Sequence, residues 1–432
     1  MNKTLERRAP EDARTPNPRR NFLRGSAALT AAAGLLGAGR AEALEPEKAD
    51  PALLPPNVPP WTRSQGGPFI NPPYGLPSRH EAGVVRVLPR VAAAFPTGSR
   101  TPLQNLHGII TPSGLVYERH HAGVPDIDPN AHRLMLHGLV ERPMMFTMED
   151  LARFPSVSQV YFLECSGNSS AELKKPTGKT AQEIHGLLSC CEWTGVALST
   201  VLQEAGIKRD AKWVLAEGAD GAAMTRSVPL GKALDDALLV YAQNGEMLRP
   251  EQGYPLRLFL PGFEGNMNVK WLRRLKLGTE PFETREETAT YTDLLPDGTS
   301  LQFTFHMEAK SVITFPSGGQ KLKARGFYEI SGLAWTGRGK VKRVEVTLDG
   351  GKSWVEARLQ EPVLSKALAR FRLPWQWDGG PALIASRCID DAGVQPSMAE
   401  VLKLRGANSN YHNNAIQYWK IDADGSVQNV RA

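Results

Sequence analysis

A cysteine at the end of an apolar segment is the residue of this sequence best suited to bind a soft metal. The segment Val160-Tyr-Phe-Leu-Glu164 leads directly into Cys165-Ser-Gly-Asn168. Aromatic and β-branched residues predict a strand here, and Ser, Gly and Asn predict a tight loop after it. A strand that presents a thiol in such a loop directs a soft ligand towards a metal. Burial as a small apolar side chain and disulfide bonding are the alternatives for this cysteine.

Three further clusters supply charged groups that a bound anion would need. The first is Tyr117-Glu-Arg119-His-His121, where an arginine beside two histidines is suited to a phosphate. The second is the acidic turn Glu217-Gly-Ala-Asp220-Gly. The third is Gln252-Gly-Tyr-Pro-Leu-Arg257 together with Asn268-Val269-Lys270-Trp, in which cations stand in apolar surroundings and need an anionic partner. A solvated loop, an ordinary turn and a surface ion pair are the respective alternatives.

Together these clusters offer one thiol, several cations and a carboxylate. A large anionic cofactor, bound through its phosphate and carrying a soft metal held by the cysteine, would use all of them. No Walker loop and no dinucleotide-binding glycine motif offers another explanation for the cations.

The predicted elements place these residues in a mixed α/β domain between residues 105 and 290. A capping box at Thr147-Met-Glu-Asp150 predicts a short helix that Pro155 ends, and the strand to Cys165 follows. Apolar residues at helical spacing predict a second helix from Trp193 to Gly206. Leu256 to Leu260 predicts a short strand.

After residue 300 the pattern changes to short strands. Val341 to Leu348 and Trp354 to Leu359 flank Asp349-Gly-Gly351, which predicts a hairpin with a glycine turn. Residues 322–333 and 382–390 predict two further strands. Several short strands in a segment of about 130 residues are typical of a β-sandwich.

The amino terminus predicts an export signal. The twin-arginine motif Arg19-Arg-Asn-Phe-Leu-Arg24 precedes a mildly apolar stretch from Ala27 to Gly39 and the small residues Ala41-Glu-Ala43. This order is that of a twin-arginine signal peptide over residues 1–43, which predicts a periplasmic protein. Proteins that use this route are exported folded, so a cofactor would be inserted in the cytoplasm.

Removal of this segment changes the charge of the chain. Residues 1–43 hold eight Lys/Arg and four Asp/Glu, and so carry four of the six net positive charges; the remainder is near +2. That charge gives no reason to expect nucleic-acid binding. No stretch after the signal is apolar enough to span a bilayer. Residues 44–104 predict an extended segment, because ten of the 33 prolines lie between residues 45 and 80.

The cysteines do not form a recognisable disulfide framework. The chain has four, and Cys190, Cys191 and Cys388 accompany Cys165. The periplasm permits disulfides, and whether these three cysteines form any stays open. The sequence contains no Cys-x-x-Cys-His motif, so we expect no haem on this chain.

The order of these motifs resembles the sulfite oxidase family of molybdopterin enzymes over residues 105 to 415. Glu-Cys165-Ser-Gly-Asn is similar to the family's Cys-Ala-Gly-Asn loop, whose cysteine ligates molybdenum. Arg119-His-His121-Ala-Gly-Val-Pro125 is similar to the family segment Arg-Asn-His-x-Pro-Val-Pro. Four later blocks match in order: Tyr241-Ala-Gln-Asn244-Gly-Glu, Gly253-Tyr-Pro-Leu-Arg257, Val269-Lys270-Trp271-Leu and Leu348-Asp-Gly-Gly-Lys-Ser-Trp354.

The resemblance implies an α+β protein with two folded domains. A molybdopterin-binding catalytic domain would span residues 105–295, and an Ig-like β-sandwich dimerisation domain would span residues 300–420. Cys165 would bind molybdenum, and Arg119, Tyr291 and Arg372, with Arg370 as its rival, would complete the catalytic site. The residues implied to hold the molybdopterin are Tyr117, Arg119, His121, Asp220, Gln252, Arg257, Asn268, Val269 and Lys270.

Three departures from the family pattern bear on the substrate. Ser169 and Ser170 stand where the family has two arginines, Gln252 replaces a histidine, and a pocket tryptophan is absent near Glu183. Loss of one guanidinium weakens the binding of a small dianion by about 2 kcal/mol. The resemblance therefore implies oxidation of sulfane sulfur on a carrier protein, during thiosulfate oxidation, rather than of free sulfite.

The family likeness also implies partners. Electrons would pass to a c-type cytochrome subunit, and the C-terminal domain would form a homodimer, which gives a heterotetramer with the cytochrome. The alternatives are a direct sulfite dehydrogenase, a reductase of oxidised methionine, and an exported Ig-like binding protein without enzymatic activity.

Overall fold

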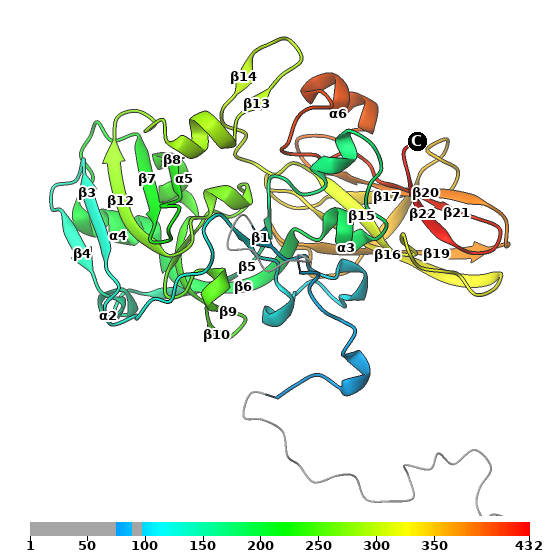
Figure 1. Cartoon of the computed structure of the whole chain (residues 1–432), viewed down its shortest axis with the longest axis horizontal. Helices are drawn as coiled ribbons and strands as arrows, with labels where there is room; N and C mark the ends of the chain where they lie inside the picture. Colours follow the sequence, from blue (N-terminus) through cyan, green and yellow to red (C-terminus); the bar gives the residue numbers. More distant parts are fainter. Residues whose placement is uncertain (1–74, 89–96) are drawn as a thin grey trace, which may run out of the picture. The chain divides into compact units, whose positions relative to one another are not determined.

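The computed structural model describes residues 75–88 and 97–432 of the protein (Figure 1). Ser78–Ala432 form one compact unit. The predicted signal peptide, residues 1–43, and most of the predicted extended segment, residues 44–104, lie outside the described residues.

The chain up to residue 278 builds two five-stranded sheets. In the first, the strand order is β4-β3-β12-β7-β8, with β3 parallel to β12 and the other neighbours antiparallel. In the second, the order is β10-β9-β6-β5, with β11 beside β9. The strands are β3 (Leu134–Gly138), β4 (Met144–Phe146), β5 (Ser156–Glu164), β6 (Leu188–Ala197), β7 (Trp213–Gly218), β8 (Thr225–Pro229), β9 (Leu238–Gln243), β10 (Glu246–Met247), β11 (Arg257–Phe259) and β12 (Leu272–Gly278).

Short helices pack against these sheets. They are α2 (Met148–Ala152), α4 (Leu198–Ala205) and α5 (Leu230–Asp235), whereas α3 (Ala181–His185) contacts the first strand of the C-terminal sheet. The predicted capping box is present at α2, where Thr147 and Asp150 exchange hydrogen bonds. Buried residues of α4 and of both sheets, among them Leu136, Leu202 and Leu258, share one hydrophobic core.

The helix predicted from Trp193 to Gly206 is correct only in its second half. Residues up to Ala197 belong to β6, and α4 begins at Leu198. Strand pairing prevails over helical spacing here because this stretch is hydrogen-bonded on both sides, to β5 and to β9. Gly195 permits the close pairing, since a Cβ there would lie 2.1 Å from the Leu239 carbonyl oxygen.

The C-terminal part is one curled antiparallel sheet of eight strands, in the order β15-β16-β19-β18-β17-β20-β21-β22 (Figure 1). The predicted hairpin around Asp349 is present as β17 and β18. The sheet folds back on itself. One contact across the fold is the hydrogen bond that Trp419 Nε1 donates to the Ile313 carbonyl (3.0 Å). Its strands are β15 (Lys310–Phe315), β16 (Gly326–Trp335), β17 (Arg343–Thr347), β18 (Val355–Leu359), β19 (Ala369–Trp377), β20 (Ala382–Ile389), β21 (Tyr418–Ile421) and β22 (Val427–Val430), with α6 (Met398–Arg405) between β20 and β21.

The core of the C-terminal sheet extends into the first part of the chain. Leu103, Phe162 and Ile184 are buried in the same cluster as Trp335 and Trp419. The Phe162 N–H also donates to the Lys366 carbonyl (2.9 Å). Strand β5, which leads to Cys165, is therefore packed by both parts of the protein.

Two small strand pairs complete the fold. They are β1 (Thr97–Gly98) with β2 (Arg119–His120), and β13 (Asp293–Leu294) with β14 (Ser300–Leu301). Short 3-10 helices lie at Arg79–Glu81, Leu103–Asn105, Ser113–Leu115, Ser170–Leu173, Pro250–Gln252 and Gly265–Met267, and a π-helical turn lies at Glu286–Thr290.

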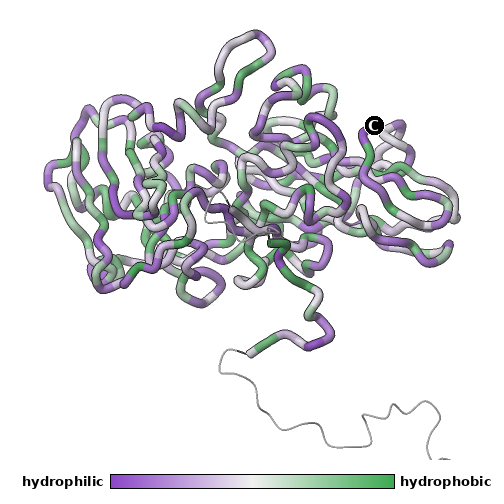
Figure 2. Tube along the Cα trace, in the orientation of Figure 1, coloured by the Kyte–Doolittle hydropathy of each residue, from purple (hydrophilic) through white to green (hydrophobic). Residues whose placement is uncertain are grey.

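Polar residues repeatedly interrupt the apolar ones along the trace (Figure 2). Among the described residues, no helix combines the length and apolar character needed to cross a membrane. All four cysteines are free thiols.

Candidate active site

Cys165 lies in the loop that follows β5, directly after Glu164. The Cys165 N–H donates to the Leu187 carbonyl (3.0 Å), and the Cys165 carbonyl accepts from the Asn168 N–H (2.9 Å). Asn168 closes the loop, since its Nδ2 donates to Glu164 (2.9 Å) and its Oδ1 accepts from the Leu187 N–H (3.1 Å). The predicted strand and tight loop are both present, and these contacts fix the loop that carries the thiol.

Two opposing influences act on the Cys165 thiol. Burial raises its pKa, while a hydrogen bond from the Gly167 backbone and the guanidinium of Arg119 lower it. A cation beside the sulfur stabilises the thiolate, which is the form that binds metals.

Cys165 borders a cavity that also contains most residues singled out in the sequence. Its empty space, including the part open to solvent, is about 670 Å³, which is typical of a cofactor site. Eleven of the twelve predicted site residues line it: Tyr117, Arg119, His121, Cys165, Asp220, Gln252, Arg257, Asn268, Val269, Lys270 and Tyr291. Segments that lie far apart in the sequence thus meet around one space.

Tyr291 joins the cavity through a contact with the first cluster. Its hydroxyl lies 2.8 Å from His121 Nε2, and Arg226 lies over its ring at 5.3 Å. Burial, followed by the nearby Cys165, raises the pKa of Tyr291, so the hydroxyl keeps its proton. Burial and Arg119 lower the pKa of His121, so its ring is neutral near pH 7. The pair can therefore present a hydrogen-bond donor without a net charge.

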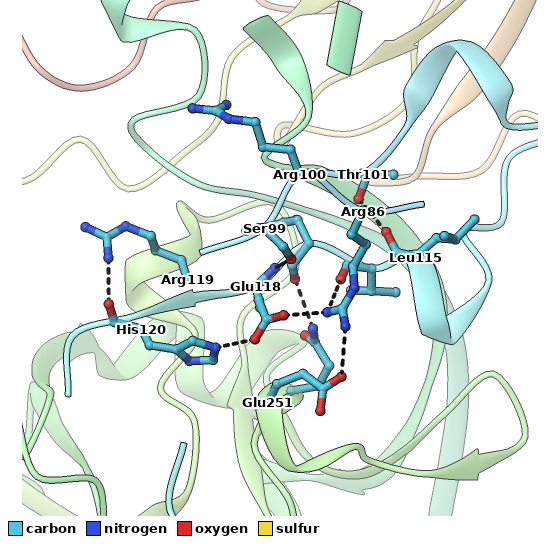
Figure 3. Close-up of polar contacts among 12 residues, drawn as sticks. Arg86, Ser99, Arg100, Thr101, Leu115, Glu118, Arg119, His120 and Glu251 are labelled. Carbon is cyan, nitrogen blue, oxygen red and sulfur yellow. Dashed lines mark hydrogen bonds and ion pairs between the residues drawn. The ribbon is translucent and has the colours of Figure 1, made fainter. Parts of the chain in front are cut away.

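A chain of polar side chains links Arg86 to Lys270, and Figure 3 shows its first three members, Arg86, Glu118 and His120. Arg86 Nη1 lies 2.6 Å from Glu118 Oε1, and Glu118 Oε2 lies 2.5 Å from His120 Nε2. His120 Nδ1 in turn lies 2.8 Å from Lys270 Nζ. Because the ammonium donates, His120 accepts at Nδ1 and carries its proton on Nε2, towards Glu118.

Lys270 Nζ has two further acceptors, the carbonyl oxygens of Arg119 and Glu251, both at 3.0 Å. Burial, and then the positive charge of Arg257, lower the pKa of Lys270 to about 7. An anion bound nearby would favour the charged form again.

Arg257 is a second cation in the cavity and is buried. It donates to the Gln252 carbonyl (3.0 Å) and to the Asn268 carbonyl (3.3 Å), while its Nε is buried and has no hydrogen-bond partner among the residues that the structure describes. Burial lowers its pKa to about 10. An unsatisfied guanidinium nitrogen, an ammonium with a depressed pKa and a thiol in one cavity fit a metal-carrying group with a phosphate.

A buried ion pair anchors the cysteine loop to the C-terminal sheet. Lys310, the first residue of β15, lies 3.1 Å from Glu164 and donates to Ser169 Oγ (3.0 Å). Trp335 Nε1 donates to the other oxygen of Glu164 (2.6 Å). The Lys310 and Glu164 side chains are 2% and 0% exposed, so neither charge is screened by solvent.

Residues 409–414, after α6, cover the same loop. The His412 N–H donates to the Ser166 carbonyl (2.6 Å), and Asn413 Nδ2 donates to the Ser169 carbonyl (2.9 Å). The Tyr411 ring packs 5.1 Å from the Tyr291 ring. The candidate site is therefore complete only when both parts of the chain are folded.

Arg372 is the one predicted site residue that the structure places elsewhere. It lies on β19, pairs with Glu329 and contacts Gln360 (3.2 and 3.3 Å). Arg370, its rival, donates to the carbonyl oxygens of Gly108 and Leu106 (2.8 and 2.9 Å). Neither lines the cavity, because each is engaged within its own surroundings, so a catalytic role for either arginine stays a prediction.

Some residues of the site were not predicted. Glu118 and His120 lie inside the first sequence cluster, and their alternation with Arg119 in a short strand is a signal that could have identified them. Lys310 and Tyr411 are distant in the sequence from Cys165, and only the fold reveals their contacts.

Two family models match successive parts of the chain. Residues 121–286 match the oxidoreductase molybdopterin binding domain, and residues 302–419 match the Mo-co oxidoreductase dimerisation domain. Sulfite oxidase from Gallus gallus is 31% identical over 349 residues, which cover 74% of this chain and 76% of that protein. The chain belongs to the sulfite oxidase family.

Other members of the sulfite oxidase family are longer than the region matched. Mitochondrial sulfite oxidase from Mus musculus is 32% identical over 356 residues, which cover 74% of this chain and 64% of the mouse protein. Nitrate reductase from Hordeum vulgare is 33% identical over 329 residues, 67% of this chain and 36% of that protein.

A solved structure of the sulfite oxidase family covers this chain more fully. The crystal structure of the sulfane dehydrogenase SoxCD from Paracoccus pantotrophus has 44% sequence identity and a TM-score of 0.85. The match covers 89% of this chain and 100% of that chain.

Residues 17–35 match the twin-arginine translocation signal, so this family member is directed to the periplasm.

Proposed function

We propose that the protein is a periplasmic molybdopterin enzyme that oxidises sulfane sulfur held on a carrier protein, as a step of thiosulfate oxidation. The observation that carries this proposal is that the Cys165 thiol lines the same cavity as Arg119, Tyr291 and the cations Arg257 and Lys270. The 44% identity to the whole SoxCD chain supports the same activity.

The cavity residues are assigned to two tasks. Cys165 would hold the metal, and Arg257 and Lys270 would bind the phosphate of the molybdopterin. Tyr117, Arg119, His121, Asp220, Gln252, Asn268 and Val269 would line the rest of that cofactor. When bound, the molybdenum cofactor supplies the two-electron oxidation of sulfur and the oxygen that sulfur receives.

Arg119, His121 and Tyr291 would act on the substrate. Arg119 would attract an anionic sulfur group and stabilise the negative charge that develops on its oxygens. The Tyr291 hydroxyl, protonated and held by His121, would donate a hydrogen bond to the same group. The segment 409–414 would help to exclude water, since its backbone and side chains cover the cysteine loop.

The preference for a carrier-bound sulfur rests on positions 169 and 170. Ser169 Oγ donates to the carbonyl oxygens of Asn168 (2.6 Å) and Asn413 (3.2 Å). Neither Ser169 nor Ser170 carries a positive charge, whereas the family has an arginine at each of these positions. A small dianion loses about 2 kcal/mol of binding with each guanidinium removed, whereas a carrier contributes its own protein contacts.

Direct oxidation of free sulfite is the second candidate. The observation in its favour is the identity of 31–32% to vertebrate sulfite oxidases over 74% of this chain. Arg119 in the cavity would serve a sulfite ion as well as a carrier-bound group.

The proposed function implies two kinds of partner. Electrons would pass to a c-type cytochrome subunit, since we expect no haem on this chain. Residues 302–419, which match a dimerisation domain, would join two copies of the protein, giving a heterotetramer with two cytochromes.

The deciding experiment combines metal analysis with turnover. The exported, mature protein is purified and assayed with sulfite and with carrier-bound sulfane in the presence of the partner cytochrome. We expect about one molybdenum per chain and a kcat/KM at least about tenfold higher for the carrier-bound sulfur. Cys165→Ser should lose turnover and keep the fold measured by circular dichroism.

Each other result has a clear meaning. A higher kcat/KM for sulfite would select the sulfite dehydrogenase. An active Cys165→Ser enzyme would overturn the assignment of the metal ligand. A properly matured sample without molybdenum would favour a binding protein.

A further inference from the structure

Arg100 is a half-buried arginine near Cys165 that belongs to no predicted cluster. It lies two residues after β1, which pairs with the strand that contains Arg119. Its Nη1 is buried and has no hydrogen-bond partner within the described part of the chain. A buried guanidinium nitrogen without an acceptor is unfavourable, and an incoming anion would satisfy it.

The backbone of Arg100 is fixed beside the cysteine loop. The Thr101 N–H donates to the Gly186 carbonyl (2.8 Å), and the next carbonyl, that of Leu187, accepts from Cys165 (3.0 Å). A Cβ on Gly186 would lie 2.8 Å from the Arg100 Cβ, so the two segments are in direct contact. Residues 186–187 thus connect the segment of Arg100 to the loop of the thiol.

Hydrogen bonds from two other segments hold this position. The Arg100 N–H donates to the Val87 carbonyl (3.0 Å), and the Arg100 carbonyl accepts from the side chain of Gln182 (2.8 Å). The side chain therefore starts from a backbone that is already positioned, and its charged end need not be ordered by the ligand alone.

Two charged groups act on the Arg100 guanidinium. Burial lowers the pKa of Arg100, while the charges of Cys165 and Glu183 raise it, so both groups lie within electrostatic reach. Glu183 is exposed and accepts from the Lys179 N–H (2.6 Å). In Figure 3, Arg100 and Arg119 extend to the same side, away from the cluster in which Glu118 engages Arg86.

We propose that Arg100 binds an oxyanion group of the sulfur substrate together with Arg119. The inference rests on the proposed function and specifies its substrate class, a sulfur compound that carries or gains negatively charged oxygens. Ser169 and Ser170 supply no cation beside Cys165, and Arg100 supplies one from a different segment of the chain. The second cation for the oxyanion would then come from a different segment of the chain than the cysteine loop.

The test measures anion binding as well as turnover. Inorganic sulfate is titrated calorimetrically into the molybdenum-loaded protein and into the Arg100→Gln, Arg100→Lys and Arg142→Gln variants. Arg142 is the matched control, because its substitution removes the same charge at an exposed ion pair with Glu204. We expect Arg100→Gln to weaken sulfate binding at least about tenfold and to raise the KM for sulfite similarly, with kcat within about threefold of wild type. Arg100→Lys should recover part of the affinity, and Arg142→Gln should match wild type.

Two results would overturn the inference. One is equal sulfate affinity in Arg100→Gln and Arg142→Gln. The other is a loss of molybdenum from Arg100→Gln with the fold kept, since Arg100 would then hold the cofactor rather than the substrate. Both are distinct from failure of the proposed function, which would appear in the wild-type protein as absent molybdenum or absent sulfur oxidation.

Discussion

At the scale of single residues, several cations lie together in the cavity. The protein without a bound anion stabilises their charged forms poorly. Lys270 has a pKa lowered to about 7, and Arg257 keeps one nitrogen without a partner. Such groups cost free energy in the empty protein and are stabilised when an anion binds. Their positions are held by neighbours, among which are Glu118 and His120.

We expect His120→Leu to weaken both the fold and cofactor retention. The substitution removes an acceptor for the Lys270 ammonium and removes the donor to Glu118 Oε2, each worth about 1–3 kcal/mol. Denaturant unfolding should show a loss of at least about 2 kcal/mol, and the molybdenum content of the purified protein should fall. His120→Asn, which retains an acceptor, should recover most of both.

The control is His137→Leu, at a half-buried histidine on β3 that does not line the cavity. It should leave the molybdenum content unchanged. Equal molybdenum loss in His120→Leu and His137→Leu would contradict the positioning role of His120.

The members of the cavity could be predicted largely as a set, because each lies in a short block with its own local signal. Cys165 follows a strand, Arg119 stands beside histidines, and Lys270 stands beside a tryptophan. Tyr411 could not be predicted, since it reaches the site through a ring contact between distant segments. The role of Arg372, which lies on β19, stays a prediction, because distance along the sequence does not report which face of a strand meets a cavity.

At the scale of elements, β5 and β15 are the parts that join the site to the C-terminal sheet. β5 ends at Glu164, β15 begins at Lys310, and their ion pair is buried one residue away from Cys165. A buried pair of this kind contributes little net stability as a pair, but removal of one member leaves a costly charge. The contact therefore serves chiefly to set the position of the cysteine loop against the sheet.

We expect Lys310→Met to lower the free energy of unfolding by about 3–5 kcal/mol, because Glu164 is left buried and charged. Chemical denaturation measures this change. The matched control is Lys321→Met, which breaks an ion pair whose side chains are 62% and 61% exposed and should cost at most about 1 kcal/mol.

A double substitution separates charge from shape. Lys310→Met with Glu164→Gln removes both charges, and the remaining amide oxygen can accept from one of the two donors, Asn168 or Trp335, so the double substitution should recover part of the lost stability. If Lys310→Met and Lys321→Met lowered the free energy of unfolding equally, the buried pair of Lys310 would have no special role.

At the scale of the whole molecule, the site is closed by segments from both ends of the folded chain. The cysteine loop lies under residues 409–414, and Ser169 contacts both β15 and Asn413. A cofactor between these segments would have to enter before or during folding. The twin-arginine route exports folded proteins, so a cofactor that enters during folding in the cytoplasm would be exported together with the protein.

We therefore predict that the export route decides whether the periplasmic protein contains molybdenum. Arg19→Lys with Arg20→Lys should leave molybdenum-loaded protein in the cytoplasm and almost none in the periplasm. Replacement of residues 1–43 by a signal for export of unfolded chains should deliver protein to the periplasm without molybdenum. The measurement is the molybdenum content of each cell fraction per unit of protein detected by immunoblot. Arg7→Lys with Arg8→Lys, an arginine pair in the same segment but outside the matched residues 17–35, should behave as wild type. Molybdenum-loaded protein delivered by the unfolded route would show instead that the cofactor enters after the chain has closed.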